Sequence, residues 1–429
     1  MRWRFLESDI LLVRDHHRTE MDHLNIETLF NTSEIKRFHF PGKLLWGQHC
    51  RKRLFELVAR QGRIAIFVDA YFANHDFTHE LRQRYRDHLA IERLVSSMPM
   101  TDQIDRAVEA LGSAPDVMIA LGGGSTIDSA KAVLAHFLYG TYDGVGMGVR
   151  RGMPVQEGAV KPLFVSLPTT AGTGAEASRY YVAYDSRTRR KVHGKSWRLI
   201  ADWILLDAVF LSAIPLATLV SSAFDAFVHY LESFLCRMER SWFGDMLSLD
   251  GMVRILDALD RFVYWNKRDE STLLQLLYAA TLGGMAISNI RTGNIHEAAG
   301  ALLEHTELTH SETLFVFFRA AYEQYRAVIT DREELLMKRL REARPDLVLE
   351  RLDDVIVWWE RTYETCGLTD HIRASLARST APPEILRRQI FERLNGDRVW
   401  ITKESPLPLD DVLTYDFIDS SLKRFTHPC

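Results

Sequence analysis

The first half of the chain alternates short apolar runs with segments of helical periodicity. Apolar residues dominate at 63–68, 117–121 and 164–167, a pattern typical of strands buried on both faces. Between them, apolar positions recur at helical spacing over 102–111, with Thr101 as the expected N-cap. Because strands that alternate with helices form parallel sheets covered by helices, this half predicts an α/β domain.

The pattern changes after about residue 214. Residues 217–237, 245–261 and 271–289 carry helical periodicity and few strand signals, so the second half is predicted to be all-helical. The fold class expected is α/β plus all-α, with a Rossmann-like parallel-sheet domain followed by a helical domain. The expected parts are an N-terminal arm at 1–36, the α/β domain at 37–212, and the helical domain with a C-terminal tail at 213–429.

The composition fits two packed domains and excludes several classes of protein. The 429 residues are 47% hydrophobic, which allows a large core, and the net charge of -4 comes from mixed charges without a basic stripe. Four cysteines lie far apart, which argues against a disulfide scaffold or a cysteine zinc site. No window approaches the roughly 20 apolar residues of a membrane span, and the apolar run at 10–13 is too short for a secretory signal. We expect a cytoplasmic protein with no nucleic-acid or membrane partner.

Three glycines follow the apolar run at 117–121, directly before an expected helix at Ser125. Glycine lets the backbone approach a phosphate closely, and a helix N-terminus offers unpaired N–H groups with a positive dipole end. The segment therefore suits a pyrophosphate. Its spacing is neither G-x-G-x-x-G nor that of the P-loop, and an ordinary glycine turn is the alternative.

Two other segments have residues suited to a nucleotide. Asp69 ends the apolar run at 64–68, where a carboxylate can accept hydrogen bonds from a ribose and repel a 2′-phosphate. Residues 168–176 crowd hydroxyls and glycines into one bend after a strand, which suits the lining of a cofactor site. A plain turn aspartate and a plain loop are the alternatives.

Two pairs of residues suggest a metal. Asp225 and His229 are four apart in an apolar helical segment, so they share one face, and a cation would offset the cost of a buried carboxylate. An Asp–His hydrogen bond in the core is the alternative. His296 and His310 are fourteen apart, roughly 21 Å along a straight helix. If both bind one ion, the chain has to reverse between them, near 304–308.

Four segments, taken in chain order, resemble the group III, iron-dependent alcohol dehydrogenase family. They are the glycine turn, which matches GGGS-x-x-D, the hydroxyl-rich bend, which matches PTTAGTG-x-E, the D-x-x-x-H segment and the two spaced histidines. The resemblance covers residues 37–380. It implies a homodimer that acts on a small molecule by reversible hydride transfer between an alcohol and NAD(P), with a divalent metal at the substrate oxygen. The metal ligands implied are Asp225, His229, His296 and His310. The cofactor-binding positions implied are Asp69, Gly122, Gly123, Gly124, Ser125, Asp128, Thr169, Thr170, Thr173 and Lys191.

Donor chemistry and charge refine these expectations. Three imidazoles and one carboxylate suit Fe²⁺, Zn²⁺ and other divalent metals, and the resemblance favours iron. Asp69 predicts NAD in preference to NADP.

The chain departs from the family pattern at two informative positions. Gly300 stands where the family often has a second histidine, a plausible proton relay. Arg179 stands where simple alcohol dehydrogenases have an apolar residue. Together with Arg150 and Arg151 on a glycine-rich loop, Arg179 predicts an acid-bearing or sugar-type substrate. A structural ion pair between Arg179 and Asp185 or Glu176 is the alternative.

Two other functions remain open. Dehydroquinate-synthase-like enzymes share this scaffold and recycle their NAD, but their metal ligands include a glutamate, whereas Asp225 fits the dehydrogenases. A non-catalytic nucleotide-binding protein is suggested by Gly300, and the intact set of four ligands argues against it.

Overall fold

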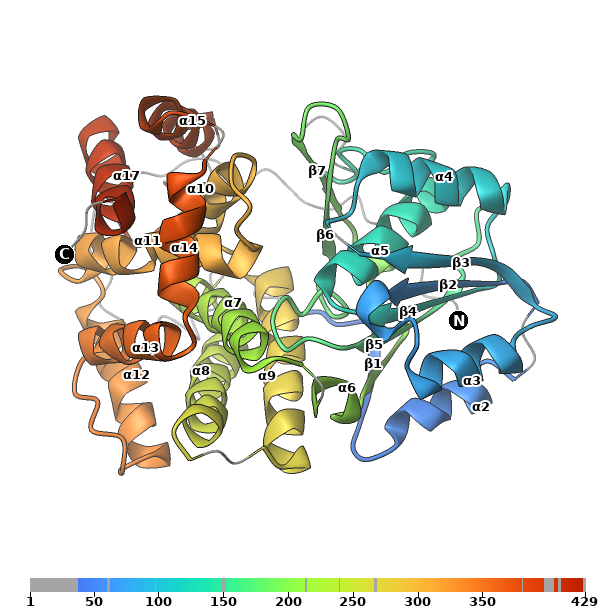
Figure 1. The fold of residues 1–429 in the computed structure, drawn as a ribbon, viewed down its shortest axis with the longest axis horizontal. Coiled ribbons are helices and arrows are strands. Elements are labelled where there is room, and N and C mark those ends of the chain that lie inside the picture. Colours follow the sequence, from blue (N-terminus) through green and yellow to red (C-terminus); the bar gives the residue numbers. More distant parts are fainter. Residues whose placement is uncertain are drawn as a thin grey trace, which may run out of the picture.

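The computed structural model describes most of the chain and divides it into an α/β part and a helical part that lie side by side (Figure 1). The N-terminal arm expected at 1–36 lies outside the described residues, as do Arg150 and Arg151. The described residues are 38–59, 62–96, 98–147, 152–212, 214–238, 240–265, 268–379, 381–396, 405–407 and 410–426.

A six-stranded parallel sheet forms the centre of the α/β part. Its strand order is β1-β8-β5-β4-β2-β3. The three strands that the apolar runs predicted, β2, β4 and β5, are adjacent in the middle of the sheet, where almost every side chain is buried. The strands are β1 Lys43–Trp46, β2 Ile64–Asp69, β3 Leu89–Val95, β4 Val117–Gly122, β5 Leu163–Pro168 and β8 Trp203–Leu206.

Helices cover both faces of this sheet. Figure 1 shows α4 (Thr101–Leu111) and α5 (Gly124–Tyr139) on one face, and α2 (Leu54–Leu57) and α3 (Asp76–Arg84) on the other. The expected N-cap of α4 was one residue off: Met100 is the N-cap and Thr101 is already helical. The Thr101 hydroxyl accepts a hydrogen bond from the backbone amide of Ser186 instead of capping its own helix.

A two-stranded antiparallel hairpin stands apart from the main sheet. It consists of β6 (Tyr180–Tyr184) and β7 (Lys191–Lys195), and Figure 1 shows it on the side of the α/β part that faces the helical part. The hairpin was not predicted, because both strands have only five residues and β7, with the sequence KVHGK, lacks an apolar run.

The second part is all-helical in the described residues, which confirms the expected fold class. Its predicted helices are α7 (Leu216–Leu235), α8 (Trp242–Val263) and α9 (Glu270–Asn289), and α7 is buried along nearly its whole length. A short helix, α6 (Val209–Ser212), precedes this part, and its other helices are α10 Asn294–Leu303, α11 His310–Tyr325, α12 Thr330–Ala343, α13 Leu352–Thr365, α14 Leu368–Ala377, α15 Pro383–Gly396 and α17 Asp411–Thr426.

Among the described residues, one helix, α9, is long and apolar enough by length and composition to cross a membrane, but 72% of that window is buried inside the protein. A core helix has the same properties. The bend after β5 packs tightly against it: a Cβ on Gly284 of α9 would lie 2.1 Å from the Gly174 carbonyl oxygen. A Cβ on Gly172 would lie 2.7 Å from the Ser222 carbonyl oxygen of α7. The two parts are therefore in close backbone contact beside α7.

Candidate metal and nucleotide site

One face of α7 carries three acidic or imidazole side chains, Asp225, His229 and Glu232. Their spacing of four and then three residues places them on a single stripe of the helix. The side chains of Asp225 and His229 are only 1% and 5% exposed. The other faces of α7 are apolar, so burial of the whole helix takes these polar groups into the interior.

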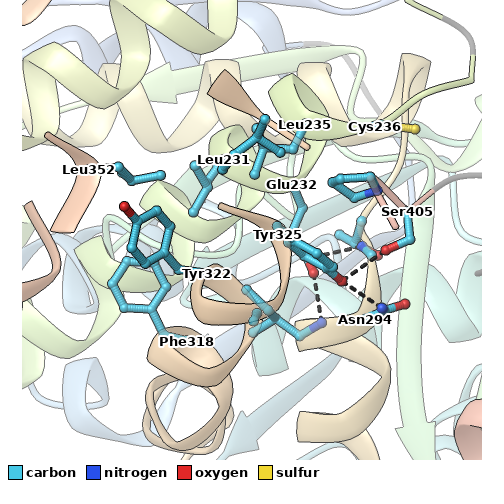
Figure 2. A pocket seen from close by; sticks show the side chains of 16 residues that line it. Leu231, Glu232, Leu235, Cys236, Asn294, Phe318, Tyr322, Tyr325, Leu352 and Ser405 are labelled. Carbon is cyan, nitrogen blue, oxygen red and sulfur yellow. Dashed lines mark hydrogen bonds between the residues drawn. The ribbon is translucent and has the colours of Figure 1, made fainter. Parts of the chain in front are cut away.

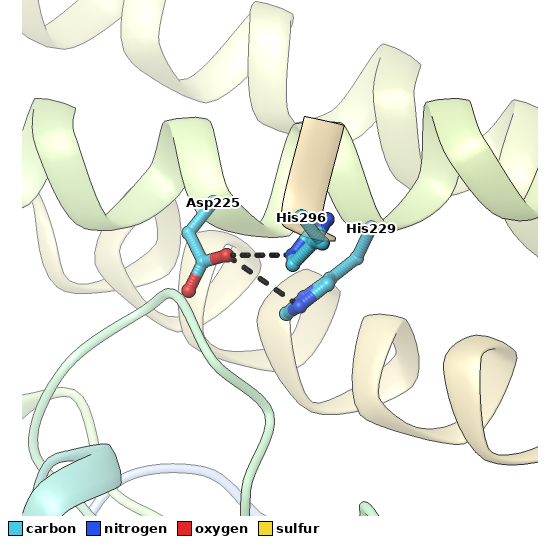
Figure 3. Close-up of side chains that lie close together, drawn as sticks. All are labelled: Asp225, His229 and His296. Carbon is cyan, nitrogen blue, oxygen red and sulfur yellow. Dashed lines mark ion pairs between the residues drawn. The ribbon is translucent and has the colours of Figure 1, made fainter. Parts of the chain in front are cut away.

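Four side chains converge at this stripe. Nε2 of His229 and Nε2 of His296 each lie 3.5 Å from Oδ1 of Asp225 (Figure 3), and Nε2 of His310 lies 3.8 Å from the same oxygen. The rings of His229 and His296 stack with their centroids 4.7 Å apart. The expected chain reversal is present, because α10 ends at Leu303 and α11 begins at His310.

These distances fit a metal better than a network of hydrogen bonds. Ligands held about 2.1 Å from a tetrahedral ion are roughly 3.4 Å from one another, close to the separations observed. A distance of 3.5 Å is long for an N–H···O bond. Oδ1 of Asp225 and Nε2 of His296 are buried without a hydrogen-bond partner in the described structure. Such unsatisfied atoms are costly, and a divalent cation would satisfy both.

The protonation states also suit a cation site. Burial raises the pKa of Asp225, but the three imidazoles outweigh it and hold that pKa below its usual range. Burial lowers the pKa of His229 to about 3 and that of His310 to about 4. Burial opposes protonation of His296 as well, yet Glu232 and Asp225 raise its pKa to about 9. Metal binding would therefore displace a proton from His296.

Glu232 was missed in the sequence analysis. Its Oε2 lies 2.5 Å from Nδ1 of His296, and its carboxylate accepts hydrogen bonds from the amides of Gly293 and Ile295. A carboxylate at Nδ1 fixes the ring orientation and presents Nε2 to the metal. The signal available was its position three residues after His229 on the same helical face.

A small cavity lies behind Glu232 (Figure 2). In its wall, the Tyr325 hydroxyl accepts a hydrogen bond from Nδ2 of Asn294 at 2.5 Å and lies 2.8 Å from Oγ of Ser405. These contacts connect the C-terminal tail to the residues that immediately precede His296.

The glycine turn and the hydroxyl-rich bend form one surface at the end of β4. A Cβ on Gly123 would lie 3.0 Å from Oγ1 of Thr170, and a Cβ on Gly124 would lie 2.8 Å from Oγ1 of Thr173. The amide of Thr169 donates to the carbonyl of Gly122. A Cβ on Gly122 would likewise collide with the side chain of Thr126, so all three glycines are required for close packing. Helix α5 begins at Gly124 without a side-chain cap, followed by Ser125, so its N-terminal amides are directed at this surface.

Asp69 stands at the same edge of the sheet. It ends β2, and Val68 of that strand pairs with Leu121, the residue before the glycine turn. Its Oδ1 accepts the amide hydrogen bond of Tyr71 at 3.0 Å, so it also caps a short 3-10 turn.

Lys191 is near enough to both α5 and the metal ligands for its charge to act on each. It begins β7; its positive charge partly offsets the rise that burial causes in the pKa of Asp128 on α5, and it adds to the fall that burial causes in the pKa of His310 on α11. The hairpin that carries it is held to α5, because Oδ2 of Asp128 accepts from the Val182 amide at 3.0 Å. Buried Lys131 donates to two carbonyls at the base of the same hairpin. Burial raises the pKa of Asp128 to about 6 despite Lys131.

Arg179 is held by aromatic rings. Its guanidinium lies 4.8 Å from the centre of the Trp197 ring and 5.3 Å from that of Tyr180. Within the described residues, no ion pair joins it to Asp185 or Glu176. Asp185 instead accepts hydrogen bonds from Thr188 and Arg187, and Glu176 accepts one from Thr281.

Two family models match the chain, one for each part. The model for iron-containing alcohol dehydrogenases covers residues 41–208, and the model for the C-terminal region of the same family covers residues 219–369. The chain belongs to the iron-containing alcohol dehydrogenase family. The second model includes all four converging side chains, and the first includes the glycine turn, the hydroxyl-rich bend and Lys191.

Individual relatives match with low sequence identity, or over only part of the chain. A sulfoacetaldehyde reductase of Bilophila wadsworthia is 30% identical over 219 residues, which is 49% of this chain and 53% of that protein. The chain therefore matches about half the length of this curated relative. The structure of an iron-containing alcohol dehydrogenase from Thermococcus thioreducens is similar with a TM-score of 0.70, at 19% identity over 90% of this chain and 100% of the other. A sulfoacetaldehyde reductase of Bifidobacterium kashiwanohense, in complex with NAD⁺, gives 0.72 at 16% identity over 92% and 100%.

Proposed function

We propose that the protein is a metal-dependent oxidoreductase that interconverts an alcohol and an aldehyde or ketone with NAD(H), and that its metal is iron. The proposal rests on the convergence of four side chains, Asp225, His229, His296 and His310. Two of their atoms, Oδ1 of Asp225 and Nε2 of His296, are buried without hydrogen-bond partners in the described structure. The charge of Lys191 acts both on His310 of this site and on Asp128 of α5, the helix that follows the glycine turn. Family membership supports the chemistry and the choice of iron.

The chain's own residues have distinct tasks in this reaction. When bound, the metal supplies Lewis-acid polarisation of the substrate oxygen and the nicotinamide supplies the hydride chemistry. Asp225 and the three histidines would hold the metal, and Glu232 orients His296. The N-terminus of α5 and the glycine turn bind the pyrophosphate of the cofactor. Lys191, with its charge near both the cofactor surface and His310, positions the nicotinamide end.

The cofactor proposed is NAD(H) rather than NADP(H). Asp69 stands beside the glycine turn at the carboxyl edge of the sheet. Its carboxylate is placed to accept hydrogen bonds from the adenosine ribose and to repel a 2′-phosphate.

The substrate proposed bears an acid group. The relative with 30% identity and one structural neighbour are both sulfoacetaldehyde reductases, whose named substrate carries a sulfo group beside the aldehyde. Arginine side chains on this chain suit such a group, because the guanidinium fork pairs with planar or tetrahedral anions.

A steady-state assay tests the proposal. Protein purified without oxygen and loaded with Fe²⁺ is mixed with NADH and either sulfoacetaldehyde, succinic semialdehyde or butanal. We expect one NADH oxidised per alcohol formed, loss of activity with a chelator, and recovery on return of Fe²⁺. Product formed without net oxidation of NADH would point instead to an enzyme that recycles its cofactor, as in dehydroquinate synthase. Nucleotide binding without any turnover would point to a non-catalytic protein.

A further inference from the structure

The turn that joins β6 to β7, residues 185–190, is rich in arginine, and we call it the arginine turn. Its sequence is DSRTRR, three arginines against one aspartate, although the whole chain has a net charge of -4. Arg187, Arg189 and Arg190 are all exposed. Within the described residues, no hydrogen bond or ion pair engages any of their guanidiniums. Because a guanidinium stays charged at every physiological pH, this turn is a permanent cluster of positive charge.

The arginine turn is held in one conformation. Oδ1 of Asp185 accepts hydrogen bonds from the amides of Arg187 and Thr188, at 3.0 Å and 2.7 Å. The hydroxyl of Ser186 accepts one from the amide of Asp102, in the first turn of α4, at 3.0 Å. Arg189 has a φ of 58°, a left-handed conformation that glycine adopts with less strain. The turn therefore keeps a charged side chain where the backbone favours glycine.

The hairpin follows α5 toward the glycine turn. Lys131 of α5 donates to two carbonyls at the base of the hairpin, whereas Asp128, nearer the start of α5, accepts from the Val182 amide. Strand β6 therefore runs antiparallel to α5. From Val182 the strand continues for about 10 Å to Asp185, whereas from Asp128 the helix continues for only about 6 Å to its first residue, Gly124. The arginine turn thus lies beyond the N-terminal end of α5.

This end of α5 is at the carboxyl edge of the sheet. Helices α4 and α5 come after β3 and β4 in the chain, so their N-termini lie near the carboxyl ends of these strands. Figure 1 shows the arrows of β2 and β3 pointing toward the side where the hairpin stands. Ligands of open α/β sheets bind at this edge. The arginine turn and the glycine turn therefore share the edge at which the cofactor is proposed to bind.

We infer that the arginine turn attracts the anionic dinucleotide cofactor over a distance and raises the rate at which it associates. This inference rests on the proposed function and adds to it the segment that speeds cofactor binding. Charges of one sign near a binding site raise the association rate of an oppositely charged ligand by about tenfold to a thousandfold. The Debye length is about 10 Å at 0.1 M salt. The attraction therefore reaches the glycine turn at low ionic strength and is screened at high ionic strength.

Other arginines of the α/β part do not offer such charge to a ligand. Arg106 of α4 pairs with Asp102 at 2.6 Å, and Arg82 of α3 pairs with Glu92 at 2.6 Å. In the arginine turn, Oδ1 of the single carboxylate, Asp185, is engaged by the turn's own amides. The three guanidiniums are thus left to act on a mobile anion, of which the pyrophosphate of NADH is the one that this edge of the sheet suits.

The test measures how fast NADH binds. The metal-loaded protein is mixed rapidly with NADH, and the fluorescence of the nicotinamide gives the association and dissociation rate constants. In the triple variant Arg187→Gln, Arg189→Gln and Arg190→Gln, we expect association to slow about tenfold at about 0.02 M salt and less than about twofold at about 0.5 M. Dissociation should change less than about twofold. The triple lysine variant keeps the charges without the planar forks and should associate as fast as wild type.

The matched control removes three exposed arginines from the helical part, as Arg341→Gln, Arg361→Gln and Arg378→Gln, and changes the net charge equally. An unchanged association rate in the glutamine variant of the turn would overturn the inference, and so would an equal loss in the control. A loss that persists at high salt, or that the lysine variant shares, would also overturn it, because direct contact with the cofactor would then be responsible. NADH binding without turnover of any aldehyde would contradict the proposed function alone.

Discussion

The carboxylate of Glu232 lies 2.5 Å from Nδ1 of His296 and accepts the backbone amides of Gly293 and Ile295. One side chain of α7 thereby fixes the start of α10 and the ring that projects from it. Asp225 and His229 lie on the same face of α7, and Nε2 of His229 and Nε2 of His296 are each 3.5 Å from Oδ1 of Asp225. The relative positions of three metal ligands thus depend on a residue that does not itself reach the metal.

Glu232→Gln is expected to weaken metal binding by about tenfold to a hundredfold while the protein stays folded. Glutamine keeps the size of the side chain and an acceptor oxygen, but it removes the negative charge that polarises the imidazole. Metal affinity is measured by competition with a chelator. The control, Glu323→Gln, alters an exposed carboxylate on α11. Equal affinity of wild type and Glu232→Gln would show that orientation of His296 does not need this charge.

His310→Ala is expected to lose metal and activity together. Its imidazole is 37% exposed, more than the other ligands, and lies 3.8 Å from Oδ1 of Asp225, so its removal opens one coordination position without a large cavity in the core. The control is His305→Ala, a histidine in the turn between α10 and α11. Elemental analysis after anaerobic purification gives the result. Full metal occupancy in His310→Ala would remove this residue from the ligand set.

Spacing along a helix is what made part of the site predictable. Asp225 and His229 could be paired from their separation alone, and the reversal between His296 and His310 followed from the length of a helix. Glu232 has the same periodicity, yet a glutamate on a helix is usually solvated, and only the position of α10 gives it a partner. The ion pair between Glu297 and Arg393 joins residues 96 positions apart. Only tertiary packing brings such groups together.

The sequence likewise predicts only the strands of the sheet that have a local apolar pattern. Apolar runs predicted the central strands β2, β4 and β5, because both of their faces are buried. Strand β1 at one edge is short and partly exposed, and β3 at the other carries Glu92 and Arg93 among its apolar residues. Both depend on pairing with a neighbouring strand, which no local pattern encodes.

Asp69→Asn is expected to raise the ratio of catalytic efficiency with NADPH over NADH by about tenfold to a hundredfold, or ~1–3 kcal/mol. Asparagine keeps an oxygen that can accept the Tyr71 amide and removes the charge that would repel a 2′-phosphate. Steady-state kinetics with both cofactors provide the ratio. Asp76→Asn, an exposed change in the first turn of α3, is the control. Equal efficiencies with both cofactors in wild type would refute the assignment of Asp69 to the ribose.

His193→Gln is expected to reduce the loss of stability on acidification. Burial lowers the pKa of His193 from 6.5 to about 4, so between these values the unfolded chain binds a proton that the folded protein excludes. The stabilising contribution of neutral His193 is therefore complete above pH 6.5 and is lost as the pH falls through about 4. A shift of this size corresponds to at most about 3 kcal/mol.

Chemical denaturation of the metal-free protein at several pH values in this range measures the effect of His193→Gln. The free energy of unfolding of the variant should fall less steeply with decreasing pH than that of wild type, and the other titrating groups cancel in the comparison. The control is His88→Gln, because His88 is exposed in the turn directly before β3. Parallel curves for wild type and His193→Gln would mean that the ring is already solvated in the folded protein.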